Sequence, residues 1–337
     1  MNTDDQPLVS ICCVGYNHAR FIKDNIKALW DSGYENLEII VVDDGSTDKS
    51  GEILKEFQKQ SPYSMKVILQ KNTGNVGHNF NKALHKAKGK FIYFTSLDDF
   101  LYPKKLKECI NRLVKSPNLA FVASSKVSAV DCEGKKSNLV SDLKLDSIEN
   151  PRVDDLLELE YSDFNSFYIQ GAFFRKDIID KIGGFDEDMT GDDIVLRTKV
   201  FRYLKEHSEY GYEIIKEPIC YYRQHNENIS GNSVRQIKIV TEYLQRYWAD
   251  RENPDVLVTW ALHAIKNLKF EESIGLFSMN TRAALLLANN KIQKALMKKA
   301  RRETSILRHI YYKTKEKNKR TITVFSFFKI SYTKKDS

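Results

Sequence analysis

The sequence predicts an α/β fold in which a mostly parallel central sheet is flanked by helices and followed by a helical C-terminal region. In the first 125 residues, short apolar runs alternate with longer segments of helical period, as in βαβ units. From residue 233 onward, apolar residues recur every three or four positions, which indicates helices. With 337 residues, 42% of them hydrophobic, the chain can form a substantial core. We therefore expect an α/β domain over 1–230, with halves at about 8–125 and 126–230, and a helical, basic region over 231–337.

The elements follow in order from these patterns. The predicted strands are the short apolar runs Leu8–Val14, Leu37–Val42, Lys66–Gln70, Lys90–Thr95 and Leu119–Ser125. The predicted helices between and after them are Arg20–Ser32, Ser50–Lys59, Phe80–Ala87, Pro103–Lys115 and Arg175–Ile182. A proline near the start supports the fourth helix, and Gly183 and Gly184 end the fifth. Because the segment from Asp131 to Asp163 is polar and irregular, we expect the sheet to be interrupted there.

The charge of the chain is concentrated at its C-terminal end. The net charge is +8, from 53 basic and 45 acidic residues, but residues 291–337 contain fifteen basic and three acidic side chains. This tail thus carries +12, and the other 290 residues carry −4. Such a tail can bind nucleic acid or the anionic leaflet of a membrane, and composition alone leaves both partners open.

Cysteine usage and the N-terminal residues predict a cytoplasmic protein. The cysteines are odd in number and form no CxxC pair, which indicates reduced thiols: Cys12, Cys13, Cys109, Cys132 and Cys220. The segment Met1–Pro7 is polar, and no stretch approaches eighteen uninterrupted apolar residues. We therefore expect neither a signal peptide nor a transmembrane helix.

Two of the predicted strands end in acidic residues. Asp43 and Asp44 follow one apolar run, and Asp98 and Asp99 follow another. Because ligands bind beyond the carboxyl ends of parallel strands, we expect these four carboxylates to converge on one crevice and to hold Mg²⁺ or Mn²⁺. The alternative for the first pair is a turn that caps a helix. The sequence lacks both GxGxxG and GxxxxGK[ST], so hydride transfer and P-loop phosphate binding lose support.

At these residues the sequence resembles glycosyltransferase family 2, which comprises inverting, metal-dependent enzymes with the GT-A fold, a Rossmann-like sheet flanked by helices. The resemblance covers about residues 8–230. The motifs that carry it are Leu8-Val9-Ser10-Ile11 leading to Tyr16-Asn17, then Val41-Val42-Asp43-Asp44-Gly45-Ser46-Thr47-Asp48, then Asn72-Thr73-Gly74-Asn75-Val76-Gly77 with Asn81, Ala83, Ala87 and Gly89. The family's DxD strand follows, although Ser96 stands where the first Asp of that triplet is usual.

The resemblance implies a nucleotide-sugar site. By it, Asp43 accepts from the ring N–H of the base, Asp44 lies near the ribose, and Asp98 is a metal ligand beside the diphosphate, with Asp99 in support. The other residues that it implies in nucleotide binding are Tyr16, Asn17, Gly74, Asn75, Gly77 and Ser96. Manganese or magnesium is the implied cofactor.

Two later motifs complete the resemblance. Gly191-Asp192-Asp193-Ile194 is similar to the family's acidic pair at the start of a helix, whose second acid is the general base. We expect Asp193 in that role, with Asp192 as the substitute, and the alternative is that both acids only cap a helix. Tyr222-Arg223-Gln224-His225 is similar to the family's YRxH element. It implies that Arg223 and His225 face the diphosphate, and that His225 also ligates the metal, together with Asp98 and Asp99.

The activity so implied is inverting transfer of a sugar from a nucleoside diphosphate sugar to a sugar hydroxyl, and the donor that we expect is a UDP-sugar. The expected acceptor is a glycan or a polyprenyl-diphosphate-linked sugar in the synthesis of a bacterial surface polysaccharide such as O-antigen or capsule. We expect the basic tail to rest on the inner, anionic face of the cytoplasmic membrane as a peripheral contact. The alternative is a solvated basic helix and a short hairpin that pack on the body of the protein. The apolar faces of its helices also allow an oligomer.

Two rival functions come from other classes. A flavodoxin-like receiver domain also binds Mg²⁺ at paired acids and accepts phosphate on Asp, but it does not explain the acidic pair at Asp192 and Asp193. A nucleotide-binding protein that contacts nucleic acid through its tail would show strong salt-dependent affinity. We expect no nucleic-acid partner.

Overall fold

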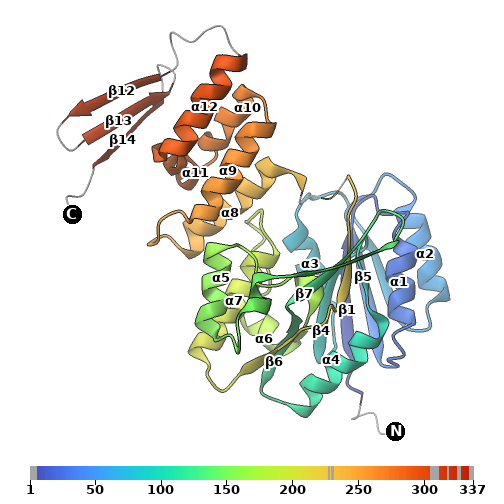
Figure 1. The fold of residues 1–337 in the computed structure, drawn as a ribbon. Coiled ribbons are helices and arrows are strands. Elements are labelled where there is room, and N and C mark those ends of the chain that lie inside the picture. The colour runs from blue at the N-terminus through green and yellow to red at the C-terminus, as the bar shows by residue number, and fades with distance from the viewer. Residues whose placement is uncertain are drawn as a thin grey trace. The chain divides into compact units, whose positions relative to one another are not determined.

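The structure, a computed structural model, describes residues 6–226, 228, 231–303, 311–316, 319–324 and 328–333. The chain forms two compact units, Met1–Gly231 and Asn232–Ser337. Each unit has its own secondary structure (Figure 1).

The first unit is built on a seven-stranded sheet in the order β10-β6-β9-β4-β1-β2-β3. Its strands are β1 (Val9–Gly15), β2 (Leu37–Asp43), β3 (Ser64–Leu69), β4 (Phe91–Ser96), β6 (Leu119–Ser124), β9 (Ala172–Arg175) and β10 (Gly211–Ile215). All neighbouring strands are parallel except β9, which runs antiparallel to both β4 and β6. Because β1 and β2 are buried along their whole length, they read in the sequence as continuous apolar runs.

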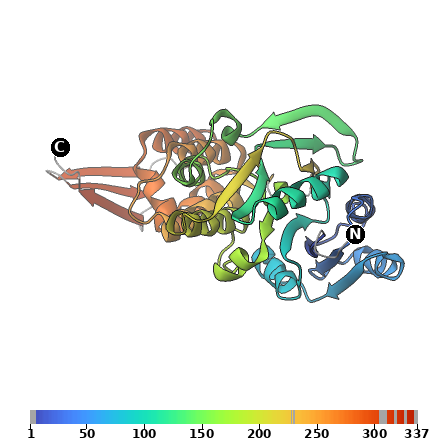
Figure 2. The ribbon, with the colours of Figure 1, turned by 90° about the horizontal axis from the view of Figure 1, so that it is seen from below.

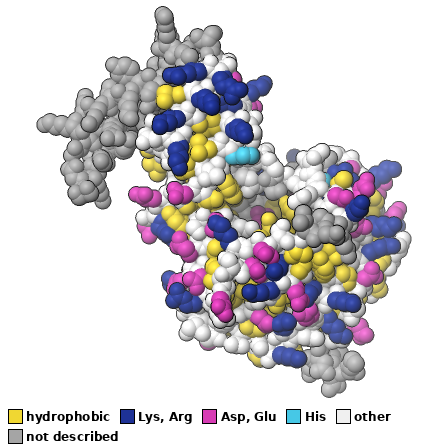
Figure 3. All heavy atoms as spheres, in the orientation of Figure 1, with side chains coloured by type: hydrophobic (Ala, Val, Ile, Leu, Met, Phe, Trp, Pro, Cys, Tyr) yellow, Lys and Arg dark blue, Asp and Glu magenta, His cyan; other side chains and the backbone are white. Residues whose placement is uncertain are grey.

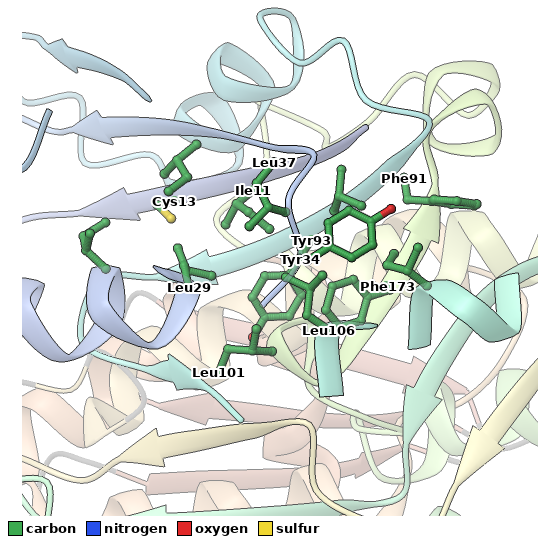
Figure 4. Close-up of a cluster of buried hydrophobic side chains, with 14 of the residues drawn as sticks. Ile11, Cys13, Leu29, Tyr34, Leu37, Phe91, Tyr93, Leu101, Leu106 and Phe173 are labelled. Carbon is green, nitrogen blue, oxygen red and sulfur yellow. The ribbon is translucent and has the colours of Figure 1, made fainter. Parts of the chain in front are cut away.

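Helices cover both faces of this sheet, as the view from below shows (Figure 2). On one face, α1 (Ile22–Trp30), α2 (Ser50–Gln60) and α4 (Pro103–Lys115) share a hydrophobic core with the strands (Figure 4). On the other face lies α3 (Val76–Leu84), whose Phe80 contacts Phe94 of β4. The predicted helices and strands of the first 125 residues are thus present, with ends shifted by a few residues.

A smaller sheet and three helices complete the first unit. The sheet has the order β5-β11-β7-β8, formed by β5 (Phe100–Leu101), β7 (Lys126–Val130), β8 (Lys136–Asp142) and β11 (Cys220–Arg223). The helices are α5 (Val153–Ser162), α6 (Lys176–Lys181) and α7 (Asp193–Glu206). The polar segment after Asp131 is therefore more regular than its composition indicates, since it contains both β8 and α5.

The second unit begins with helices. They are α8 (Ser233–Tyr247), α9 (Asp255–Asn267), α10 (Phe270–Gly275), α11 (Thr281–Leu285) and α12 (Asn290–Glu303). The chain then forms a three-stranded antiparallel sheet, β12 (Tyr311–Glu316), β13 (Lys319–Val324) and β14 (Phe328–Thr333), which the helical pattern did not predict. In the described part of the chain, no helix combines the length and the apolar character that crossing a membrane requires.

Candidate active site

The acidic residues that follow β2 and β4 lie at the same edge of the large sheet. These two strands flank β1, with Gly15 paired to Asp43 and Val14 paired to Ser96. Since the three strands are parallel, their carboxyl ends open on one side. The structure thus brings together the two segments that the sequence predicts to share a crevice.

The loop after β2 is organised around Asp43 and Asn17. The Asp43 carboxylate accepts from the Ser46 backbone N–H at 2.9 Å and from the Ser46 hydroxyl at 2.5 Å. Asn17 adopts a left-handed backbone conformation, with φ of 56°, and its Oδ1 accepts from the Thr47 N–H at 2.8 Å. Neighbouring Tyr16 is 44% exposed, so its ring is available to a ligand.

Asp44 anchors the next loop. Its carboxylate accepts from Gln70 Nε2 at 2.8 Å, from the Thr73 N–H at 2.9 Å and from the Gly74 N–H at 3.0 Å. Burial raises the pKa of Asp44, but these hydrogen bonds outweigh it and hold the pKa below its ordinary value. Gly45 is required beside it, because a β-carbon there would lie 2.5 Å from the Asn72 backbone nitrogen. Asp44 therefore holds protein loops together, and its expected place near the ribose stays a prediction.

The asparagine and glycine segment enters α3. Asn75 caps the helix by accepting from the His78 N–H at 2.9 Å, and its own amide donates to the Glu187 carbonyl at 2.5 Å. Gly77 lies against Phe185, where a β-carbon would be 3.3 Å from that side chain. This segment thus connects the nucleotide half of the unit to the loop before α7.

Asp98 is buried just beyond β4, between two imidazole rings. Its Oδ2 lies 3.1 Å from His225 Nε2 and 3.8 Å from His18 Nε2. Its Oδ1 is buried and has no hydrogen-bond partner among the described residues. Burial raises the pKa of Asp98, but the hydrogen bonds with His225 and Ser96 and the nearby charge of His18 lower it to about 2. Asp98 is thus ionised at neutral pH and has one oxygen left for a ligand.

Asp99 points into the protein. Its Oδ1 accepts from the Arg223 backbone N–H and its Oδ2 from Gln170 Nε2, both at 2.8 Å. Burial and the charge of Asp98 raise the pKa of Asp99 well above its usual range. Because protein donors occupy both oxygens, Asp99 supports the loop that presents Asp98.

Arg223 lies beneath the same loop. Its guanidinium donates to the Asp98 carbonyl at 2.9 Å, to the Cys132 carbonyl at 3.0 Å and to Asp24 Oδ2 at 2.7 Å. The side chain is 1% exposed and lies between the rings of Phe21 and Phe100. Protein acceptors therefore already bind this buried cation, and the expected diphosphate contact of Arg223 stays a prediction.

The residues present fit a metal ion that substrate oxygens also bind. In the described ranges, no group of three or more His, Cys, Asp or Glu side chains has the arrangement to hold a metal ion by itself. Magnesium typically takes one or two carboxylates together with substrate phosphates. The unpartnered Oδ1 of Asp98 and the adjacent His225 imidazole match that requirement.

The second acidic pair lies at the start of α7. Asp192 is the N-cap residue, and Asp193 is the first helical residue, with a side chain that is 33% exposed. Asp193 Oδ2 lies 3.4 Å from Arg197 Nη1. Burial and the charge of Asp193 raise the pKa of Tyr168, and Gln170, two residues further on, contacts Asp99. The segment from Tyr168 to Gln170 thus connects the surroundings of Asp193 to the acidic loop.

Sequence reasoning gave little weight to several residues of this site. His18 directly follows the Tyr16-Asn17 motif, and this position in the sequence could have indicated that it lies in the site. Asp24, Gln170 and Glu160 carried no signal, because each lies in a segment without a motif and meets its partner only through the fold.

A family model described as Glycosyl transferase family 2 matches residues 10–183, just over half of the chain. The chain is 31% identical over 140 residues to an uncharacterized glycosyltransferase of Haemophilus influenzae, an alignment that covers 42% of this chain and 55% of the relative. It is 34% identical over 106 residues to the putative teichuronic acid biosynthesis glycosyltransferase TuaG of Bacillus subtilis, covering 32% of this chain and 42% of that protein. The chain thus spans about half or less of the length of these curated relatives.

Solved structures share the fold over most of the chain. The mannosyltransferase PcManGT of Pyrobaculum calidifontis, in complex with GDP-Man and Mn²⁺, superposes with a TM-score of 0.52 at 18% identity and covers 88% of this chain and 87% of its own. Residues 1–349 of Staphylococcus aureus TarS, in complex with UDP-GlcNAc, give 0.52 at 15% identity, covering 98% and 100%. The α/β fold with C-terminal helices is therefore the predicted GT-A fold.

We expect Arg223→Met to lower the free energy of unfolding by roughly 3 kcal/mol, since it leaves buried carbonyl groups and Asp24 without their donor. The matched control is Asp24→Asn, which removes only the charge of the half-exposed partner and should cost less than about 1 kcal/mol. Urea denaturation measures both. Equal losses in the two variants would contradict the supporting position of Arg223.

Proposed function

Because the chain belongs to glycosyl transferase family 2, and is thus a transferase that uses a nucleotide-sugar donor, we propose that it transfers a sugar from a UDP-sugar to a glycan hydroxyl with inversion. The observation that carries the proposal is Asp98, an ionised carboxylate with one unpartnered oxygen beside His225. The family assignment does not favour the receiver and nucleic-acid alternatives.

The donor is held by the loops at the carboxyl ends of the strands. The Asp43 carboxylate, whose oxygens each retain a second lone pair beside the Ser46 bonds, accepts from the N–H of the uracil ring. The exposed ring of Tyr16 packs on the base. Asp44 shapes this pocket indirectly, through the loop that it anchors.

The diphosphate lies beside Asp98 and His225. Asp98 and His225 would hold Mn²⁺ or Mg²⁺ there, and the metal would neutralise charge on the leaving diphosphate. Asp99 and Arg223 support this position indirectly, because their hydrogen bonds fix the loop and the backbone that carry Asp98. The hydroxyl of Ser96, in the place of the usual first Asp, contributes a hydrogen bond to Asp98.

Asp193 removes the proton of the acceptor hydroxyl. The oxygen of that hydroxyl forms a bond to the anomeric carbon, the bond from this carbon to the diphosphate breaks, and UDP leaves with the bonding electron pair. Because attack and departure occur on opposite faces, the configuration inverts without a covalent intermediate. The partly exposed side chain of Asp193 at the start of α7 supports this role, with Asp192 as the neighbouring substitute.

The acceptor that we propose is a lipid-linked glycan, such as a polyprenyl-diphosphate-linked sugar, presented at the anionic inner face of the cytoplasmic membrane. The support is α12, whose exposed face carries a stripe of cations: Lys291, Lys294, Lys298, Arg301 and Arg302. Basic side chains gather on the surface of this unit (Figure 3). Such a stripe suits contact with anionic lipid.

Calorimetry tests the donor site. We expect UDP to bind in the presence of Mn²⁺, and Asp98→Asn to weaken that binding at least tenfold because it removes the carboxylate charge on the metal. GDP and dTDP serve as competing nucleotides. Asp180→Asn, an exposed position of α6, is the control and should bind as the wild type does. Binding of none of the three nucleotides would refute the donor site.

Substitution of Asp193 tests the base. Asp193→Asn should reduce transfer to about 1% or less, since general bases typically contribute two to four orders of magnitude, while UDP affinity stays within twofold. The measurement is UDP release from UDP-sugars with a polyprenyl-diphosphate sugar as acceptor. Glu206→Gln, at the other end of α7, is the matched control. Full activity of Asp193→Asn would exclude it as the base.

Vesicle binding tests the membrane contact. Replacing Lys291, Lys294 and Lys298 by Gln should weaken binding to vesicles of anionic lipid about 100-fold, at roughly 1 kcal/mol for each cation near the surface. The control replaces three exposed lysines of the first unit, Lys23, Lys27 and Lys59, and should bind unchanged. Cosedimentation measures both, and equal binding by the two triple variants would remove the proposed surface.

A further inference from the structure

A buried ion pair joins α5 to α7 below the position of Asp193. Arg197 Nε lies 2.8 Å from Glu160 Oε1, and Arg197 Nη2 lies 2.9 Å from Glu160 Oε2. The guanidinium and the carboxylate thus form a bidentate ion pair. The Arg197 and Glu160 side chains are 2% and 0% exposed. Ser166 donates to the same carboxylate through its backbone N–H and its hydroxyl. The carboxylate is thus fully engaged by protein donors.

The pair fixes the orientation of the guanidinium. Nη2 of Arg197 also donates to the Phe164 carbonyl at 3.3 Å, and the guanidinium lies 5.9 Å from the centroid of the Phe167 ring. A planar guanidinium with two nitrogens bonded to one carboxylate cannot rotate without losing both bonds. Its third nitrogen, Nη1, therefore points in a defined direction.

Nη1 faces the proposed base. It lies 3.4 Å from Asp193 Oδ2, and the two residues are one helical turn apart, at i and i+4 of α7. Buried ion pairs contribute little net stability, because desolvation offsets their attraction. We therefore look for the role of this ion pair in the orientation of the side chains around it and not in net stability.

Resting on the function proposed above, we infer that Glu160 and Arg197 are positioning residues that fix the carboxylate of Asp193 in the orientation that receives the acceptor proton. Glu160 acts only through Arg197, and Arg197 acts only through Asp193. Loss of the pair should lower kcat and leave donor binding unchanged, because a small misplacement of a catalytic group slows the chemical step.

Three variants test this inference with the transfer assay described above. Arg197→Lys keeps the charge but removes the planar fork, and it should lower kcat at least tenfold while KM for the donor stays within twofold. The paired change Glu160→Met with Arg197→Met leaves no unpaired buried charge, so it should fold and show the same loss of kcat. Lys199→Met is the matched control: Lys199 also lies on α7, and the change removes its 2.7 Å ion pair with Asp186, so the variant should retain kcat within twofold.

A double-mutant cycle separates positioning from a structural role. Asp193→Glu displaces the carboxylate by itself, so Arg197→Lys should change kcat less than twofold in that background. Equal fold-losses in the wild-type and Asp193→Glu backgrounds would overturn the inference. Full kcat in a folded paired variant would overturn it as well. Failure of the proposed function is recognised separately, because the wild type would then release no UDP in the transfer assay. Failure of the base assignment is also distinct, because Asp193→Asn would then remain active.

Discussion

The site depends on the burial of Arg223 beneath the loop that carries Asp98 and Asp99. One guanidinium satisfies carbonyl groups of two loops and the carboxylate of α1, while the Arg223 backbone satisfies Asp99. The end of β11 is thereby fixed against the end of β4, and His225, two residues further on, is brought to Asp98. Removing this cation would therefore affect every group that we assign to the diphosphate.

The same physical device occurs twice. Arg197 is a second buried cation whose nitrogens are committed to protein acceptors, and it lies beside Asp193 as Arg223 lies beside Asp98. In both places a rigid planar group contacts an acidic residue that we assign to the site, through its backbone carbonyl at Asp98 and through its carboxylate at Asp193. In the proposed chemistry Asp98 binds the metal and Asp193 removes a proton. Arg223 therefore supports the first of these residues, and Arg197 supports the second.

Sequence patterns were sufficient for the strands that place the acids and insufficient for the contacts that orient them. Continuous apolar runs predicted β1, β2 and β4, because strands of a covered parallel sheet are buried on both faces. The same logic located Asp43 and Asp98. It did not distinguish Asp44, whose oxygens accept from Thr73 and Gly74, from an acid that faces a ligand. That distinction depends on contacts between segments about thirty residues apart, which no local pattern encodes.

Residue type alone also did not indicate the protein contacts of a cation. An arginine after a strand end in a nucleotide site suggests a phosphate contact, and for Arg223 that contact stays a prediction. The structure adds that Arg223 is buried and donates to backbone carbonyl groups of two loops. The guanidinium of Arg223 contacts the backbone of Asp98 and not its carboxylate. Among the described residues, the basic side chains next to that carboxylate are the imidazoles of His18 and His225. In the function that we propose, the open oxygen of Asp98 is therefore the position at which a divalent metal would offset the charge of the diphosphate.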